Sequence, residues 1–111
     1  MRHTTVFGTF AIEPMPGQPQ VGLCHGFFVP IKQRGRGFAH KLKKQQIQFL
    51  HAENFDFGIC TVDGANTAQQ HVLTKAGWSK LAEFDNSRTG GKTQIWGAPV
   101  QTVTTQKKEL A

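Results

Sequence analysis

The residues whose types and spacing could do chemistry gather in one stretch of the chain, Phe27 to Ala39. An apolar segment runs there through Gly35 and Gly37 into the start of a helical pattern. The first amides of a helix have no partner inside the helix and lie at the positive end of its dipole, and glycines let a phosphate approach the backbone. Arg34 and Arg36 add positive charge beside these amides. The stretch therefore predicts a binding site for a phosphate-bearing ligand, although it also fits a tight turn with solvated arginines.

The net charge also favours an anionic ligand. Thirteen Lys and Arg residues against seven Asp and Glu residues give a formal charge of +6, and such a balance suits nucleic acid, a membrane surface or a phosphorylated cofactor. Much of this charge lies in one segment that contains Lys32, Arg34, Arg36, Lys41, Lys43 and Lys44. No recognisable nucleic-acid-binding motif accompanies it, so we do not expect nucleic acid as a partner.

His25 is the candidate catalytic residue. It precedes the glycine-rich loop by a few residues and, in strict strand alternation, shares a face with Phe27 and Val29. An imidazole titrates near neutral pH and can act as a general base. A single histidine in a strand carries no spacing information, so an ordinary strand histidine is the alternative. The remaining histidines show no metal-ligand spacing, and we expect no metal site and surface positions for His3, His40, His51 and His71.

The elements that must position these residues begin with two strands. Residues 5–12 form the first, because the apolar residues Val6, Phe10 and Ile12 recur with even spacing. Three prolines and a glycine predict a loop over residues 13–19. The second strand spans residues 20–29 and ends at a proline, which lacks an amide hydrogen.

An amphipathic helix is predicted from Phe38 to about His51. Its apolar stripe contains Phe38, Leu42, Phe49 and Leu50. We expect the rest of its surface to be covered by Lys41, Lys43, Lys44, Gln45 and Gln48.

The second half of the chain predicts a strand, a helix and two further strands. Residues 55–62 form the strand, and Asn66 is a good N-cap for the helix, which stops at Gly77. We expect this helix to direct four side chains toward the core: Ala68, Val72, Leu73 and Ala76. Strands over 78–84 and 92–96 flank a polar loop of hairpin character. This order predicts one α+β domain over residues 1–100, with a mixed sheet and a crossover between its second and third strands, and a polar tail over 101–111.

Two motifs resemble those of the GNAT superfamily of acyl-CoA-dependent N-acyltransferases. In the family's pyrophosphate loop, Gln or Arg is followed at the third position by Gly and at the fifth by Gly or Ala, and Arg34, Gly37 and Ala39 stand at these positions. Downstream, the family typically has an Asn that opens a helix ending in a Gly-aromatic pair, similar to Asn66 and Gly77-Trp78 here. The resemblance covers most of residues 21–84.

The resemblance implies a mixed, mostly antiparallel sheet flanked by helices, and acetyl transfer from acetyl-CoA to a primary amine. It places the pyrophosphate of coenzyme A on backbone amides of Arg34, Gly35, Arg36, Gly37, Phe38 and Ala39. The pantetheine arm would pair with exposed backbone of Phe27, Phe28 and Val29. Asn66 would contact the pantetheine or cap its own helix.

The chain departs from the family in two ways. Many GNAT enzymes carry a Tyr as general acid where Leu73 stands here, and this sequence contains no Tyr. Few residues precede the central strand, so we expect the usual N-terminal strand and helices, which wall the acceptor pocket, to be missing. The alternative function is therefore a non-catalytic acyl-CoA-binding or protein-interaction module. We also expect a homodimer, formed through the aromatic-bearing strands around residues 84–96.

The sequence also bears on the compartment. No apolar stretch approaches the roughly 18 residues of a membrane span, and no signal-peptide pattern opens the chain. Cys24 and Cys60 lack the spacing of a zinc site or a disulfide scaffold, so we expect buried thiols in a reducing compartment. A cytoplasmic protein that does not interact with membranes is the expectation.

Overall fold

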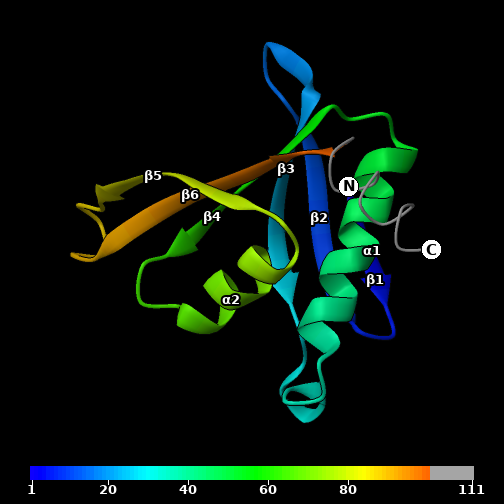
Figure 1. Ribbon diagram of the computed structural model, residues 1–111, viewed down its shortest axis with the longest axis horizontal. Coiled ribbons are helices and arrows are strands. Elements are labelled where there is room, and N and C mark those ends of the chain that lie inside the picture. The colour runs from blue at the N-terminus through cyan, green and yellow to red at the C-terminus, as the bar shows by residue number, and fades with distance from the viewer. Residues whose placement is uncertain (101–111) are drawn as a thin grey trace.

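Six strands and two helices, with a short 3-10 helix at Ile31–Gln33, make up residues 1–100, the part of the chain that this computed structural model describes (Figure 1). The elements are β1 (Arg2–Thr5), β2 (Gly8–Met15), β3 (Gln18–Phe28), α1 (Phe38–Ala52), β4 (Phe57–Asp63), α2 (Thr67–Lys75), β5 (Ser79–Asp85) and β6 (Lys92–Pro99). The predicted tail, 101–111, lies outside the described residues. None of the helices within residues 1–100 has the length and apolar character needed to cross a membrane.

The strands form one mixed sheet in the order β1-β2-β3-β4-β6-β5. Every neighbouring pair is antiparallel except β3 and β4, which run parallel and are joined by the crossover through α1. The α+β class, the mixed and mostly antiparallel sheet and the crossover are confirmed. The sheet has one strand more than the sequence predicted.

The additional strand, β1, precedes the predicted first strand, residues 5–12, whose residues 8–12 belong to β2 but whose start is wrong. The chain turns at Val6 and Phe7, so that β1 precedes the turn and β2 follows it. Thr5 stabilises this turn, because its Oγ1 accepts a hydrogen bond from the Phe7 amide at 3.0 Å. Val6, predicted to point inward, is therefore 74% exposed at the tip of the turn.

The proline-rich segment, residues 13–19, is not a long loop. β2 continues to Met15 and β3 begins at Gln18, with a tight turn at Pro16 and Gly17 between them. Pro14 and Pro19 are tolerated because neither sits where a third strand needs their amide hydrogen. β1 pairs with β2 only as far as Ala11, and β4 pairs with β3 only from Val21.

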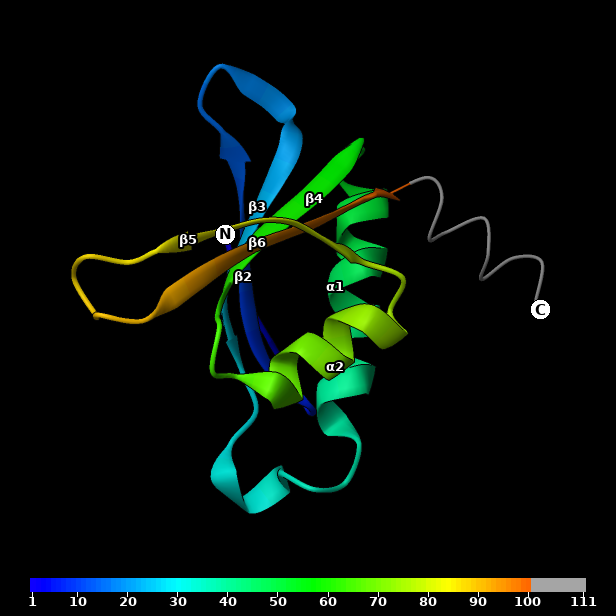
Figure 2. The same ribbon diagram turned by 60° about the vertical axis from the view of Figure 1, so that its left-hand side comes forward.

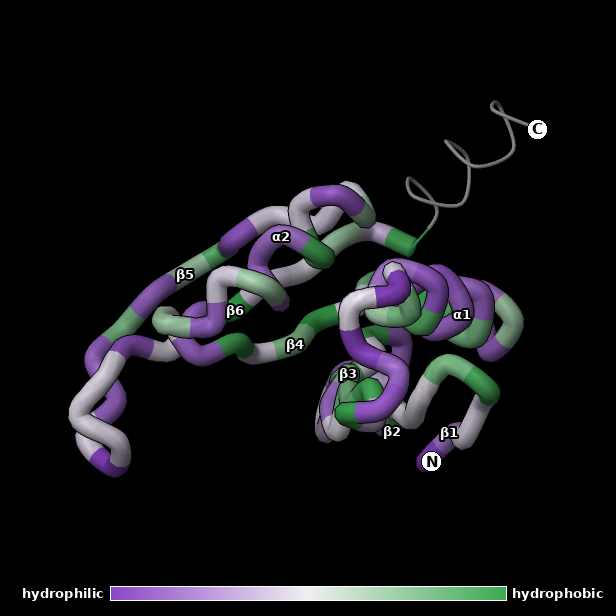
Figure 3. Tube along the Cα trace, turned by 90° about the horizontal axis from the view of Figure 1, so that it is seen from below, coloured by the Kyte–Doolittle hydropathy of each residue, from purple (hydrophilic) through white to green (hydrophobic). Residues whose placement is uncertain are grey.

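Both helices lie on one face of the sheet, and within residues 1–100 no helix covers the other face (Figure 3; Figure 2 shows the same two helices from the side). The core lies beneath them. Phe10, Leu42 and Leu73 are fully buried, and Trp78 and Trp96 nearly so. Burial of each such side chain contributes about 1.5–3 kcal/mol to stability, so this cluster holds α1 and α2 to the sheet.

The predicted helix α2 is confirmed, with one correction. Asn66 caps it, because its Oδ1 accepts a hydrogen bond from the Gln69 amide at 3.0 Å. Val72 and Leu73 are buried as expected. Ala68 is exposed instead of inward, because it lies in the first turn of the helix, where α2 leaves the sheet at the edge of a cleft.

The predicted exposed surface of α1 is also partly wrong. Lys41, Lys44 and Gln48 are exposed, but Lys43 is buried. The buried face of α1 consists of Leu42, Lys43, Gln46 and Leu50. Half of these residues are polar, so the buried face could not be identified from the apolar residues alone.

Candidate functional site

The site begins where two neighbouring strands separate. β3 and β4 are paired only from Val21 to Leu23 on β3 and from Phe57 to Ile59 on β4. Beyond these residues β4 continues beside β6, whereas β3 continues beside β2, and the two strands diverge (Figure 1). Residues of β3 after Leu23 therefore have no strand on their β4 side within residues 1–100, and their backbone groups face the opening.

A bulge reshapes β3 at this opening. Ala11 pairs with His25 and Thr9 pairs with Phe28, so β3 contains one more residue than β2 over this stretch. Gly26 has a φ of 63°, a conformation that glycine adopts without strain. The predicted alternation of His25 with Phe27 and Val29 is therefore wrong, since the bulge changes the phase of the strand.

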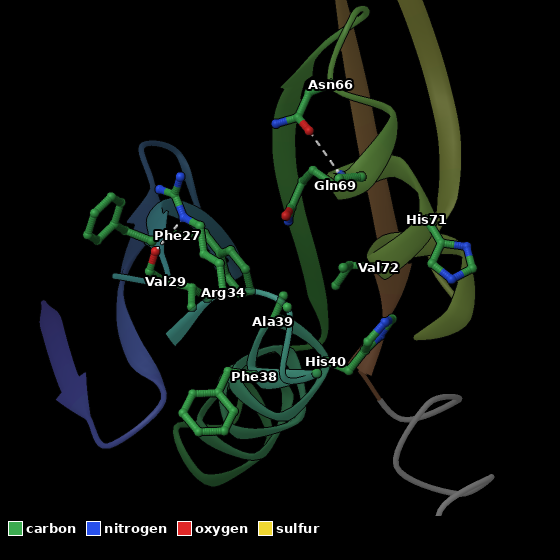
Figure 4. A pocket seen from close by; sticks show the side chains of 14 residues that line it. Phe27, Val29, Arg34, Phe38, Ala39, His40, Asn66, Gln69, His71 and Val72 are labelled. Atoms are coloured by element: carbon green, nitrogen blue, oxygen red, sulfur yellow. Dashed lines mark hydrogen bonds between the residues drawn. The ribbon is translucent and has the colours of Figure 1, made fainter. Parts of the chain in front are cut away.

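A cavity with a volume of about 540 Å³, the outer cleft, lies between the β3–α1 loop and α2 (Figure 4). Nearly all the predicted cofactor-binding residues line it: Phe27, Phe28, Val29, Arg34, Gly35, Gly37, Phe38, Ala39 and Asn66. Arg36 is exposed and does not line the cleft. His40 and His71, predicted to be surface residues, stack edge to face at 5.6 Å in its wall. Burial, with Lys75 and His71 nearby, lowers the pKa of His40.

The N-terminus of α1 opens into the outer cleft. Its N-cap is Gly37, with a φ of 73°, and no side chain caps it. The first turn carries no acidic residue. At this end of the helix, the Lys41 amide donates a hydrogen bond to the Gly37 carbonyl. A Cβ built on Gly35 or Gly37 would meet nothing within 4 Å. The first amides of α1 are thus uncapped, with open space beside the loop.

Arg34 stabilises the loop that leads to this helix. Its Nε donates a hydrogen bond to the Val29 carbonyl at 2.9 Å, and its guanidinium lies over the Phe28 ring at 5.4 Å. These contacts hold the positive charge of Arg34 in the wall of the outer cleft, which the N-terminus of α1 also borders.

The smaller cavity, the inner chamber, has a volume of about 300 Å³ and lies between the diverging strands. It shares Phe27, Asn66 and Gln69 with the outer cleft, so the two cavities adjoin. His25 borders it, half exposed, with its Nε2 3.9 Å from Oε1 of Glu13.

Lys43 is the site residue that the sequence analysis missed. It borders the inner chamber and is only 2% exposed. Its Nζ donates a hydrogen bond to Oε1 of Gln46 at 2.6 Å and lies 3.5 Å from the centre of the Trp78 ring. Burial lowers the pKa of this ammonium group. Helical spacing could have identified it, because Lys43 lies seven residues before the buried Leu50, on the same face of the helix.

Two thiols also border the inner chamber. Cys24 is buried as predicted, whereas Cys60 is half-buried, and the two are not joined by a disulfide. Burial raises the pKa of Cys24 to about 12 and also raises that of Cys60. Both thiols are therefore neutral at physiological pH.

Leu73 stands where many GNAT enzymes carry a Tyr as general acid, and it is fully buried in the core. It therefore contributes packing and no proton. His3, predicted on the surface, is half-buried and stacks on Phe49 at 4.0 Å.

No protein-family model and no curated protein sequence matches the chain. Its architecture, however, matches many solved structures, and acetyltransferases are among them. An IAA acetyltransferase from Bacillus cereus superposes with a TM-score of 0.75 at 12% identity, over 86% of this chain and 71% of that one. A GCN5-related N-acetyltransferase from Kribbella flavida gives 0.71 at 21% identity, over 82% of this chain and 58% of that one. The chain has the GNAT fold.

The structure of the NatC complex bound to Gag peptide and CoA gives a TM-score of 0.71 at 20% identity. The match covers 82% of this chain and 58% of that one. The chain thus spans little more than half the length of the Kribbella and NatC structures. Within the GNAT fold, the outer cleft and the inner chamber lie where β3 and β4 diverge.

Proposed function

We propose that this chain is an acyl-CoA-dependent N-acyltransferase that binds acetyl-CoA in the outer cleft and acylates a primary amine. The observation that carries the proposal is the uncapped N-terminus of α1, which opens beside Gly35 and Gly37 into the same cleft as the unpaired end of β3. One end of the cleft suits phosphates, and the other suits an extended amide-containing arm. The CoA that accompanies the NatC neighbour supports this choice of ligand.

The residues present fit coenzyme A. The first amides of α1 would hold the pyrophosphate, with Arg34 in the wall of the same cleft and Arg36 as an exposed charge in the adjoining loop. The open backbone of Phe27, Phe28 and Val29 would hold the pantetheine arm. Asn66 Oδ1 is engaged in capping α2, so we assign Asn66 to the wall of the cleft. The thioester of the bound ligand supplies an activated acyl group.

We assign His25 as the proton acceptor for the amine. It borders the inner chamber at the end of the same strand, half exposed, where it is accessible to an incoming amine. Positioning of the two reactants contributes the rest of the acceleration. His25→Ala should retain affinity for acetyl-CoA and lose turnover; full turnover in this variant would remove His25 from the mechanism.

The proposal is tested by calorimetric titration with acetyl-CoA followed by a thiol-release assay against a panel of primary amines. We expect binding and amine-dependent release of CoA. The second candidate, a non-catalytic acyl-CoA-binding module, is favoured by the aliphatic Leu73 at the general-acid position. Binding without turnover against any amine would support that candidate, and absence of binding would exclude both.

Arg36→Ala is expected to weaken acetyl-CoA binding up to about fivefold at low salt, as an exposed ion pair contributes up to about 1 kcal/mol. The effect should shrink between about 0.01 M and about 0.15 M salt, because the Debye length falls from about 30 Å to about 8 Å. Titrations at both salt concentrations measure it. Arg88→Ala, in the exposed β5–β6 loop, is the matched control; equal losses in both variants would assign the effect to net charge.

We also propose that the chain forms a homodimer, through the edge strand β5. Its Leu81 and Phe84 side chains are 51% and 48% exposed. Trp96, which we had included in the contact, is buried in β6, inside the sheet. Light scattering at micromolar concentration should give a dimer mass, and Phe84→Glu should give a monomer. A monomer mass for the parent protein would contradict the dimer.

A further inference from the structure

The inner chamber is larger than an acetyl group needs. Its volume is about 300 Å³, whereas a water molecule occupies about 30 Å³ in the liquid. It adjoins the outer cleft at Phe27, where β3 leads from the N-terminus of α1 into the space between the strands. A ligand arm that follows β3 from the outer cleft therefore brings its acyl end to this chamber. An acetyl group there would leave most of the chamber to water.

The chamber also contains a buried cation without an anionic partner. Within residues 1–100, no carboxylate oxygen lies within 4 Å of the Lys43 Nζ. Its partners are the Gln46 amide oxygen, the Trp78 ring and, at 5.9 Å, the Phe27 ring, and all three are uncharged. An ammonium group has three donors, and a buried charge without a counter-ion is unfavourable by several kcal/mol. Lys43 is thus the group of the chamber that an anion would stabilise most.

The other titratable groups around the chamber do not supply that anion. Cys24 from β3 and Cys60 from β4 are neutral thiols, because burial raises the pKa of both. Asp63, at the end of β4, accepts a hydrogen bond from the Ala65 amide at 2.8 Å through its Oδ1, within its own turn. The imidazole of His25 supplies no negative charge, and its nearest carboxylate is that of Glu13.

We propose that Lys43 selects an acyl group that ends in a carboxylate, so that this GNAT-fold protein binds a dicarboxylic acyl-CoA such as succinyl-CoA more tightly than acetyl-CoA. The inference rests on the proposed function and specifies its acyl donor. The carboxylate would accept a charge-assisted hydrogen bond from Nζ, and its carbon chain would occupy space that an acetyl group leaves to water.

The experiment compares the affinities of the full chain for CoA, acetyl-CoA, butyryl-CoA and succinyl-CoA by calorimetry. Butyryl-CoA has the same acyl length as succinyl-CoA and no charge, so the ratio of their dissociation constants isolates the carboxylate. We expect succinyl-CoA to bind at least about tenfold more tightly than butyryl-CoA, the ratio for about 1.4 kcal/mol. Lys43→Met should reduce the ratio to about one. Lys44→Met, an exposed neighbour on the same helix, should leave it unchanged.

Two results would overturn the inference while leaving the proposed function intact: equal affinities of the parent protein for succinyl-CoA and butyryl-CoA, or a preference that persists in Lys43→Met. The first of these comparisons uses the parent protein alone, so it decides even if the variant does not fold. Failure of CoA and all three thioesters to bind would overturn the proposed function itself, and the inference with it.

Discussion

Gly37→Val is expected to weaken acetyl-CoA binding by about a hundredfold, because a side chain at this position would occupy the space beside the uncapped amides of α1. No protein atom lies within 4 Å of a Cβ at Gly37, so the side chain would project into open space instead of the core. Loss of two hydrogen bonds to a charged group, each worth about 1.5–3 kcal/mol, accounts for at least this factor. Calorimetric titration of the parent protein and the variant measures the ratio.

The positive φ of Gly37 requires a matched control, since valine is strained at 73° whatever its surroundings. Gly90 in the β5–β6 loop has a φ of 78° and equally open surroundings, but it does not line the outer cleft. Gly90→Val should therefore lose similar stability and retain full affinity. Equal affinities of the two variants would contradict a phosphate site at Gly37.

Lys43→Met is expected to raise the free energy of unfolding by about 1–3 kcal/mol near pH 6, since replacing a buried charge by an apolar side chain of similar length is often stabilising. The gain is net of the lost contact between Nζ and the Trp78 ring, which is worth about 2 kcal/mol when desolvated. Urea unfolding measures it, with Lys44→Met expected to stay within about 0.5 kcal/mol of the parent. A loss of stability in Lys43→Met would mean that the contacts of the ammonium group outweigh its desolvation.

The same variant should show a defined pH dependence. The pKa of Lys43 is lowered in the folded protein, whereas in the unfolded chain it is about 10.4. Between these two values the unfolded state binds more protons, so the parent protein gains stability as pH rises. The advantage of Lys43→Met is therefore largest below the folded pKa and shrinks toward pH of about 10. The raised pKa of Cys24 acts in the opposite direction above its unfolded value, and this contribution is larger in Lys43→Met, because the charge of Lys43 lowers the pKa of Cys24 in the parent protein.

Most residues that line the outer cleft could be named from the sequence, because local chemistry marks them. The glycine at the start of a helix and Arg34 before it can be read from residue type and spacing, and the structure brings them into one cleft with Asn66, the N-cap of the second helix. The bulge at Gly26 could not be predicted in this way. It depends on the register between β2 and β3, which residue types along one strand do not specify.

The inner chamber was not predicted because some of the residues that line it are buried although they are polar. Lys43 was predicted to be exposed because it is charged. It lies, however, on the buried face of α1, together with Leu42 and Leu50. Trp78, from another part of the chain, provides the aromatic face that receives it. A tertiary contact of this kind has no signature in either segment alone. The early start of the predicted first strand has a simpler reason. The turn at Val6 and Phe7 is stabilised by the Thr5 hydroxyl, which accepts a hydrogen bond from the Phe7 amide and donates one to the Gly8 carbonyl.

The most direct measurement of the central claim is an amide chemical-shift titration of the chain with acetyl-CoA. We predict that the largest shifts occur at the amides of residues 27–29 and 37–40, which line the outer cleft, and that the β5–β6 loop at residues 86–91 stays unchanged. Absence of shifts at saturating ligand, or shifts that follow the basic surface without including the N-terminus of α1, would contradict a coenzyme A site in this cleft.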